Sequence, residues 1–412
     1  MSGRRQHFIP VRKPALLAAL SESLAAKIDA AAFSRLTALL SALIHHQYFD
    51  ELERLREGHA THMHGGGTGE SNAAFDADVA LVLRQANFEE IPAEELDICD
   101  QETKGASVRT SAPKWHYDSV KFYRRGRHFR TETVKRTWPL SAKTEEIETY
   151  DDVVVVVRFR KGGSKRREKT LPAGVKPGSL LIKSFAGIPA RDLCMLYPDL
   201  RIRMTRADAI LLGAPALLGG IPILISLSSA MSVILIVLGA LLGFGGTVDD
   251  NQMMQAIGAL AALAGAGAFL FRQYNNYTLK KLKYQKRIAD SVYYRNVANH
   301  AGVFETLIGA AEDQDVKEAA LAYGFLLRDG PATRENLDAK IETWLRDTFG
   351  EDVDFEIGDA LQKLEELALV DRSGPFLTAA PLPQALRSLD ARWDSLYDSK
   401  GVAHPAASRS TA

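Results

Sequence analysis

Apolar residues recur with a helical period near both ends of the chain and alternate with polar residues in the middle. Between residues 15 and 58, leucines and isoleucines three or four positions apart fall on one helical face. Residues 114–205 contain alternating stretches and the run D-D-V-V-V-V-V-R-F-R at 151–160, whose β-branched side chains favour a strand. The pattern therefore predicts an N-terminal helical region followed by a small β-rich domain.

The C-terminal pattern predicts two helices and a hairpin. Thr333 can cap a first helix that Gly350 ends, and Asp354 can cap a second. The stretch L-V-D-R-S-G-P-F-L-T at 369–378 is typical of a β-hairpin. This order resembles a winged helix, whose second helix often enters a DNA groove. Here that helix is mainly acidic, so we expect it to contact a protein rather than phosphates.

Forty consecutive residues, 209–248, contain no Asp, Glu, Lys, Arg or His, and a second apolar run covers 253–271. About 20 apolar residues are enough to cross the hydrocarbon core of a bilayer. Basic residues flank the pair of runs on both sides, and the short connection between them is acidic. Because basic flanks prefer the cytoplasmic side, two crossings are favoured, near 221–246 and 253–272, with three as the alternative. Neither run contains an ionisable group, which favours an anchor over an ion pathway.

These elements predict an α+β membrane protein. It would comprise an N-terminal helical region with a small β-rich domain, a transmembrane helical hairpin and a C-terminal all-helical, winged-helix-like domain. The expected boundaries are 1–110 for the N-terminal helical region, 111–206 for the β-rich juxtamembrane domain, 207–273 for the transmembrane hairpin, 274–330 for a further helical region, 331–400 for the winged-helix-like module and 401–412 for a disordered tail. The prediction places both folded lobes of an integral membrane protein on the cytoplasmic, or matrix-equivalent, side.

The overall composition argues against several classes of protein. The chain has 51 basic and 51 acidic residues among 412, so no global positive field marks it as a nucleic-acid-binding protein. Its two cysteines, Cys99 and Cys194, supply neither a disulfide framework nor a set of metal ligands. The basic N-terminus is not followed by an apolar segment, so no secretory signal is expected. No cofactor is predicted.

Basic residues gather on the predicted turns of the β-rich domain and after the second apolar run. Beside a membrane such residues are attracted to anionic lipid, by about 1 kcal/mol each. A solvated surface and, less favoured, a contact with nucleic acid are the alternatives. The residues expected at the membrane surface are Arg124, Arg125, Arg127, Arg166, Arg167, Lys280, Lys281 and Lys283.

Two further groups of polar residues are candidate sites. A histidine tract precedes a Gly-Gly-Gly run, and its members are His59, His62 and His64. The tract favours a flexible connector over a metal site, and no metal is predicted. The second group comprises Arg295, Asn296, Asn299 and His300. His300 could act as an acid or base with Glu305 or Glu312, but no nucleophile motif accompanies it, so contacts between helices are favoured and the catalytic residues stay unassigned.

Four tracts together resemble the group of proteins around transmembrane protein 143. They are K-S-F-A-G-I-P-A-R-D-L-C-M-L-Y-P at 183–198, Y-Y-R-N-V-A-N-H-A-G-V-F at 293–304, D-V-K-E-A-A-L-A-Y-G-F-L-L at 315–327 and V-D-F-E-I-G-D-A-L-Q-K-L-E-E-L-A-L-V at 353–370. The resemblance extends from about His7 to Val370. It implies a shared domain of unknown function and a membrane location, mitochondrial in animals, without a catalytic signature. The histidine tract matches nothing in that group, so no metal role is implied for it.

The sequence therefore predicts a membrane-anchored adaptor or scaffold rather than an enzyme. Its expected partners are the lipid bilayer, anionic lipid headgroups and a protein, with no nucleic acid and an unassigned oligomeric state. The alternatives are a membrane-surface enzyme with a site around His300 and a transporter or channel subunit. No recognised catalytic motif favours the first alternative, and no charge within the apolar runs favours the second.

Overall fold

The computed structural model describes part of the chain, in two compact units. The described residues are 5–97, 109–111, 114–135, 142–162, 171, 174–198, 201–203, 235, 238–239, 242 and 250–396. The first unit is formed by residues 1–91, 115–190 and 296–412, and the second by 92–114 and 191–295. Each unit therefore combines segments that are distant in sequence, and the first unit is interrupted twice by the second.

A five-stranded antiparallel sheet lies in the first unit. Its strands are in the order β1-β3-β4-β5-β7, with bounds Glu89–Glu90, Tyr117–Lys135, Ala142–Phe159, Leu180–Pro189 and Asn296–Asn299. The strands β3 and β4 form a long hairpin whose register runs from Ser119 opposite Arg158 to Lys135 opposite Ala142. The strand predicted at 151–160 is confirmed as the second half of β4. Its five valines, Val153–Val157, are all buried, as a β-branched run in a central strand should be.

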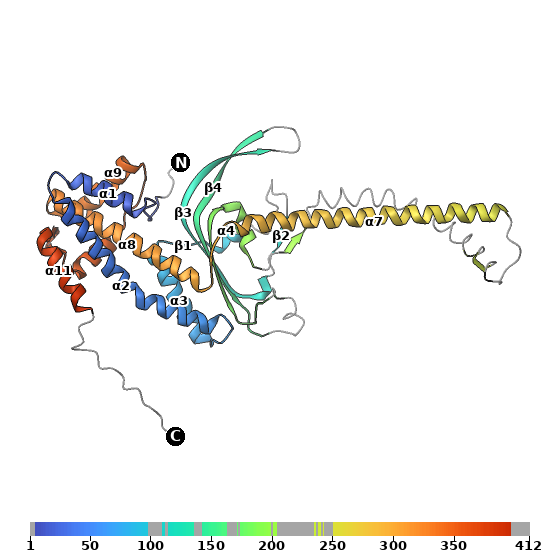
Figure 1. Ribbon diagram of the computed structural model, residues 1–412, viewed down its shortest axis with the longest axis horizontal. Helices are drawn as coiled ribbons and strands as arrows, with labels where there is room; N and C mark the ends of the chain where they lie inside the picture. Colours follow the sequence, from blue (N-terminus) through green and yellow to red (C-terminus); the bar gives the residue numbers. More distant parts are fainter. Residues whose placement is uncertain are drawn as a thin grey trace, which may run out of the picture. The chain divides into compact units, whose positions relative to one another are not determined.

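Helices of the first unit gather on one side of this sheet (Figure 1). They are α1 (Lys13–Leu24), α2 (Ala30–His62), α3 (Gly69–Gln85), α8 (Ala301–Asp329), α9 (Arg334–Phe349), α10 (Ile357–Glu366) and α11 (Leu382–Ser395). The helix α8 is central, because it packs against α1, α2, α3, α9 and α10. Residues 319–326 of α8 are all buried, so this stretch is enclosed by protein on every side.

The C-terminal segment of the first unit has the predicted order of helix, helix and hairpin. Short strand β8 (Ala332–Thr333) pairs with β10 (Phe376–Ala379), which also pairs with β9 (Val370–Ser373). Thr333 caps α9, because its hydroxyl accepts a hydrogen bond of 3.3 Å from the Asn336 amide, and Gly350 ends α9 in the left-handed conformation. Both caps confirm the sequence prediction. Asp354 does not cap α10, since the residue before that helix is Glu356, without a side-chain cap.

The second unit contains short elements and one long helix. The short elements are α4 (Ala93–Asp97), β2 (Arg109–Ser111) and β6 (Arg201–Arg203), and β2 pairs antiparallel with β6. Two 3₁₀ helices, η2 (Lys114–His116) and η3 (Ala190–Leu196), lie where the chain passes between units. The long helix is α7, which continues for 44 residues from Asp250 to Tyr293 (Figure 1). At 1.5 Å per residue it is about 66 Å long.

The predicted transmembrane hairpin is contradicted by the described residues. None of their helices combines the length and the apolar character that a bilayer crossing requires. The predicted fold class of an α+β membrane protein and the integral membrane location are therefore wrong. The described fold is mixed α/β with a five-stranded antiparallel sheet. The predicted span near 221–246 lies outside the described residues, apart from Leu235, Leu238, Gly239 and Leu242.

The physical reason for this correction is visible in α7. The stretch 253–271 lacks charge, but it contains seven alanines and three glycines, whose small or absent side chains bring little apolar surface. The helix does not end near 272, where the predicted crossing ends, but continues through the basic residues as far as Tyr293. The absence of charge in this stretch therefore does not by itself indicate a bilayer crossing, because the apolar area of its side chains is small.

Two glycines of α8 provide a matched test of the packing around this helix. A Cβ at the exposed Gly309 would meet no atom within 4 Å, whereas a Cβ at Gly324 would lie 3.3 Å from both methyl groups of Leu20 on α1. We expect Gly309→Ala to raise the unfolding free energy by about 0.5–1 kcal/mol, because alanine favours the helix. Gly324→Ala should gain less or destabilise, since Leu20 has to shift. Urea unfolding of the full chain measures both, and equal gains would show that α1 has room to move.

Candidate functional site

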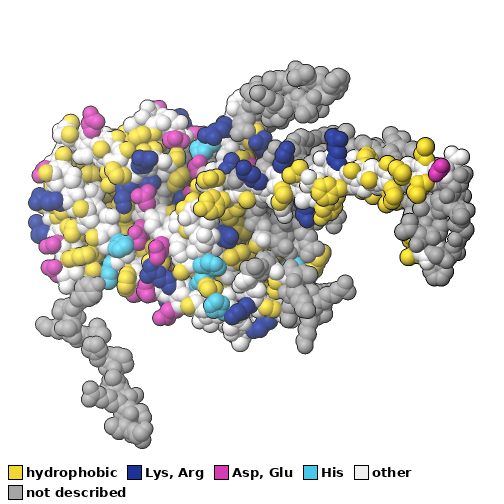
Figure 2. Space-filling view, turned by 45° about the vertical axis from the view of Figure 1, so that its right-hand side comes forward, with side chains coloured by type: hydrophobic (Ala, Val, Ile, Leu, Met, Phe, Trp, Pro, Cys, Tyr) yellow, Lys and Arg dark blue, Asp and Glu magenta, His cyan; other side chains and the backbone are white. Residues whose placement is uncertain are grey.

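The described side chains of α7 form an exposed apolar surface. Met254, Ile257, Leu270 and Phe271 are each more than 60% exposed. Figure 2 shows hydrophobic side chains along this helix, with Lys and Arg among them. Exposed apolar surface of this extent on a protein usually marks a contact with a partner. This helix is therefore one candidate site.

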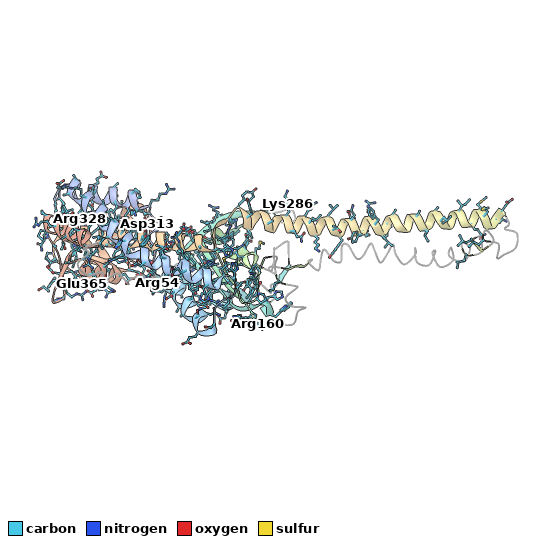
Figure 3. The ribbon with its side chains drawn as sticks, turned by 60° about the horizontal axis from the view of Figure 1, so that its bottom comes forward. Arg54, Arg160, Lys286, Asp313, Arg328 and Glu365 are labelled. Carbon is cyan, nitrogen blue, oxygen red and sulfur yellow. The ribbon has the colours of Figure 1, made fainter. Side chains whose placement is uncertain are left out.

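The second half of α7 exposes both aromatic and basic side chains. Leu270, Tyr274 and Tyr277 follow the i, i+4, i+7 spacing that places side chains on one side of a helix, and all are exposed. The basic residues Arg272, Lys283 and Lys286 lie on another side and are exposed too, and Lys286 is labelled in Figure 3. The separation is incomplete, because exposed Lys281 shares the side of Leu270 and exposed Leu279 shares the side of Arg272. This segment, residues 270–286, is called the exposed segment of α7 below.

The predicted membrane-surface arginines of the sheet have acidic or aromatic partners. Arg124 donates to the Tyr150 hydroxyl at 3.1 Å, and its guanidinium lies 3.9 Å from Glu89. The Arg125 guanidinium pairs with Asp152 at 2.6 Å, and Arg127 lies 2.5 Å from Glu148. Their charges are therefore largely balanced within the sheet, which leaves little of each charge for an external anion.

The remaining predicted surface residues divide between described and undescribed positions. Arg166 and Arg167 lie outside the described residues. Lys280 belongs to α7, but its side chain is not described, whereas Lys281 and Lys283 are exposed on that helix. Of the predicted membrane-surface residues, those that the structure describes as exposed are therefore on α7. Arg272 and Lys286, which belong to the predicted basic flank after the second apolar run, are exposed there too.

A second candidate site lies in the first unit, where two sequence-distant histidines meet. His59 is in the last turn of α2, and His300 is the residue before α8. Their ring centroids are 5.6 Å apart. Phe304, one turn into α8, lies against His59 at 5.7 Å, and Phe75 of α3 lies 6.1 Å from Phe304. The predicted histidine tract and the predicted cluster around His300 thus converge in an aromatic setting.

The imidazoles of this cluster have unsatisfied nitrogens. His59 and His62 are both 3% exposed. Three buried ring nitrogens, His59 Nε2, His62 Nδ1 and His300 Nδ1, have no hydrogen-bond partner. A buried polar atom without a partner costs about 1–3 kcal/mol, and its presence calls for an explanation. Each unpartnered nitrogen is a potential hydrogen-bond donor in one tautomer and an acceptor in the other.

Burial lowers the pKa of these histidines. The pKa of His59 falls to about 4, chiefly because burial disfavours the charged ring, and the neighbouring His300, His64 and His62 lower it further. The pKa of His300 is lowered by burial and then by Lys183 and His64. The rings of His59 and His300 are therefore neutral at neutral pH, which is the form that binds metals and accepts protons.

Glycines allow the chain to approach the histidines closely. A Cβ at Gly58 would lie 2.3 Å from the Phe75 ring, and a Cβ at Gly67 would lie 2.3 Å from His62 Nδ1. Gly65 adopts a φ of 79°, which glycine tolerates best. The Gly-Gly-Gly run at residues 65–67 is therefore a tight turn, and it allows the start of α3 to lie close to the end of α2. His62 Nε2 lies 3.4 Å from the Ser71 hydroxyl, in the first turn of α3.

Glu305 and Glu312, the carboxylates expected to assist His300, interact with other residues. Glu305 accepts a hydrogen bond of 2.6 Å from Arg56, and the Glu312 carboxylate lies 3.0 Å from His45 Nδ1. Neither contact involves His300. In the described part of the chain, the structure therefore does not bring together the acid–base pair that the sequence suggested.

The polar cluster predicted around His300 is also distributed differently. Asn296 and Asn299 begin and end strand β7, which pairs with β5, so this stretch is a strand where a helix was predicted. The edge of the sheet supplies the backbone partners that override the local helical preference. Arg295 belongs to the second unit and lies 3.4 Å from Asp192 there. Only His300 of this cluster faces the other histidines.

The described residues contain no group of three or more His, Cys, Asp or Glu side chains that could hold a metal ion. The two rings of His59 and His300 alone are too few to satisfy a structural zinc site, which has four ligands. What the arrangement offers is a pair of neutral imidazoles among largely apolar side chains. Such a pair can accept a proton.

A domain described as "Protein of unknown function (DUF3754)" is found over residues 150–302. The match includes the second half of β4, together with β5, α7, β7 and His300. It covers less than half of the chain and brings no activity with it. No solved structure matches this chain.

The low pKa of His59 predicts a stability that falls in acid. Folded His59 binds its proton near pH 4, whereas the unfolded residue binds it near 6.5, so acid favours the unfolded chain. The unfolding free energy should therefore drop by roughly 2 kcal/mol between pH 7 and pH 4.5 through this residue. Urea unfolding at a series of pH values measures the change.

A matched pair of variants isolates the contribution of His59. His59→Phe removes the titrating ring and should flatten the dependence between pH 6.5 and 4.5. Gln47→Phe, at an exposed position on the same helix without a titrating side chain, should leave the dependence unchanged. Identical pH profiles for His59→Phe and the natural chain would exclude His59 as the source.

Proposed function

We propose that the protein is an adaptor or scaffold that binds anionic lipid headgroups peripherally through the exposed segment of α7. The observation that supports this proposal is the presence of exposed apolar, aromatic and basic side chains together on one helix. Tyrosine rings favour a membrane interface, and the cations beside them are attracted to anionic headgroups.

The free energy expected from electrostatic attraction and from burial of apolar area favours contact of this helix with a lipid surface over full solvation. Each lysine or arginine close to an anionic surface contributes about 1 kcal/mol, and three of them contribute roughly 3 kcal/mol. Leu270, Tyr274 and Tyr277 add apolar area, and tyrosine suits the interface because its ring is apolar and its hydroxyl is polar. A fully solvated role would leave these aromatic rings exposed to water without a compensating contact.

The first unit suits the protein-binding half of an adaptor. Its winged-helix-like segment exposes Phe376 at 50% and Trp393 at 41%, two side chains of the aromatic type that often dominate protein interfaces. The acidic helix α10 would be repelled by phosphates, which disfavours nucleic acid at this segment. A peptide or protein with an apolar contact residue is the partner that this chemistry fits.

Membership of the transmembrane protein 143 group is a part of the same proposal. It rests on the order and spacing of the four tracts that begin at residues 183, 293, 315 and 353. The domain over 150–302 includes the first of these tracts and most of the second. The adaptor function does not depend on this relationship.

Vesicle co-sedimentation of the full chain tests the lipid contact. We compare phosphatidylcholine vesicles with vesicles that also contain phosphatidylserine, at low and at physiological salt. Reversing three basic residues of this segment with Arg272→Glu, Lys283→Glu and Lys286→Glu should weaken binding to the anionic vesicles by about 100-fold or more. Binding of the natural chain should also fall as salt rises.

A charge-matched variant is the control for this experiment. Arg35→Glu, Arg54→Glu and Arg387→Glu change the same number of charges at exposed positions of the first unit. This variant should bind the anionic vesicles much as the natural chain does, apart from the effect of net charge. Equal loss in both triple variants, or equal binding to neutral and anionic vesicles, would contradict the proposal.

A further inference from the structure

A short segment before α1 lies extended against several elements of the first unit. Residues 5–9, called the strap below, belong to no helix and to none of the sheets. Gln6 forms an isolated parallel bridge with Val353, and the Asp354 amide donates to the Gln6 carbonyl at 2.8 Å. The Gln6 side chain donates to the Arg127 carbonyl of β3 at 3.0 Å. The strap therefore connects the winged-helix-like segment to the sheet as a bound peptide would.

Buried polar side chains bind the main chain of the strap. Gln314 accepts a hydrogen bond of 3.3 Å from the Ile9 amide, and Lys317 donates to the Ile9 carbonyl at 3.2 Å. Both are on α8 and are only 2% and 3% exposed. The Asn87 side chain donates to the His7 carbonyl at 2.8 Å. Hydrogen bonds to a main chain hold an extended peptide of any sequence, and side-chain contacts then select among sequences.

Two adjacent side chains of the strap supply the selective contacts. Ile9 is completely buried in the core of the first unit. The Arg125 guanidinium lies 4.6 Å from the centre of the Phe8 ring and 4.8 Å from the centre of the Phe88 ring, so it is attracted to both rings. The Lys317 ammonium lies 5.8 Å from the centre of the Phe8 ring. These contacts favour an aromatic residue followed by an aliphatic one.

The strap is basic where the surface beneath it is acidic. The Arg5 guanidinium lies 2.8 Å from Glu342 and 3.5 Å from Asp352, and His7 Nδ1 lies 3.5 Å from Glu356. The side chains of Arg5 and His7 are 43% and 37% exposed, so salt screens these contacts and each contributes little to holding the strap. The strap can therefore detach at this end without unfolding a helix or a strand.

We propose that the strap occupies a peptide-binding surface formed by Asn87, Arg125, Gln314, Lys317 and Val353, and that an extended segment of a partner protein replaces it there. The partner segment carries a basic residue followed, three and four positions later, by an aromatic and an aliphatic residue, as Arg5, Phe8 and Ile9 do. The proposal names a partner for the protein-binding half of the proposed adaptor and rests on that function. The surface is separate from the exposed segment of α7.

A peptide-binding measurement on the full chain tests the proposal. The probe is a fluorescent synthetic peptide with the sequence of residues 3–12, and anisotropy reports its binding. In the natural chain the tethered strap competes at an effective concentration of roughly millimolar, so micromolar peptide should bind poorly. The double variant Phe8→Ala with Ile9→Ala weakens the strap and should bind the peptide at least about tenfold more tightly. A peptide with the same two alanines should bind this variant poorly.

A second double variant releases the strap without changing a buried residue. Arg5→Glu with His7→Glu places acidic side chains opposite an acidic surface and should also bind the peptide about tenfold more tightly than the natural chain does. Phe49→Ala with Leu81→Ala is the matched control, because both side chains are exposed apolar residues on α2 and α3. This control should bind the peptide as poorly as the natural chain does.

Two results would overturn the proposal. One is peptide binding to Arg5→Glu with His7→Glu that is no tighter than binding to the natural chain. The other is equal binding of the natural and the alanine-substituted peptides. Vesicle co-sedimentation of Phe8→Ala with Ile9→Ala should match that of the natural chain, so a failure of the strap proposal is distinguished from a failure of the lipid contact.

Discussion

The burial of α8 on all sides is the interaction on which the first unit depends. Five other helices pack against it, and its residues 319–326 combine small and large apolar side chains within reach of α1 and α2. Gly324 in the middle of this stretch lets Leu20 and Leu24 of α1 approach to van der Waals distance. Because so many elements share this one helix, removing it would leave no common core for the rest.

The polar residues of α8 also connect this core to the start of the chain. Gln314 accepts a hydrogen bond of 3.3 Å from the Ile9 amide, and the Lys317 ammonium donates to the Ile9 carbonyl at 3.2 Å. The carboxyl of Glu318 accepts from Gln314 at 2.7 Å, and burial raises the pKa of Glu318 well above its ordinary value. Asp313, labelled on α8 in Figure 3, pairs with Lys317 at 2.6 Å. The backbone at Ile9 is therefore fixed by side chains more than 300 positions away.

Local chemistry explains which elements the sequence could predict. The valine run of β4, the Thr333 cap and the Gly350 stop are determined by neighbouring residues, and each was predictable without the fold. The strand β7 was not, because its backbone partner is β5, more than 100 residues earlier. Nothing in the local pattern of Asn296–Asn299 shows that a sheet edge will be present.

The helices α7 and α8 show why an uncharged stretch does not by itself locate a membrane. Residues 253–271 of α7 and residues 319–326 of α8 both lack charge, yet α8 is enclosed by protein whereas the described side chains of α7 are largely exposed. The sequence gives the number of apolar residues, while the partner that covers them depends on tertiary packing. Exposure of α7 and burial of α8 could therefore be distinguished only by the fold.

The histidine cluster shows the same limit for a site. His59 and His300 were each candidates from sequence, but they were assigned to different roles because 240 positions separate them. Their meeting is produced by His300 itself, whose amide donates to the Ile182 carbonyl at 2.9 Å and whose φ of 54° turns the chain from β7 into α8. A positive φ is unfavourable for a residue with a Cβ, by about 1 kcal/mol or more, and persists only when the surroundings fix it. The backbone is thus held in this conformation by both the sheet and the central helix. The position of the His300 ring opposite His59 follows from that junction.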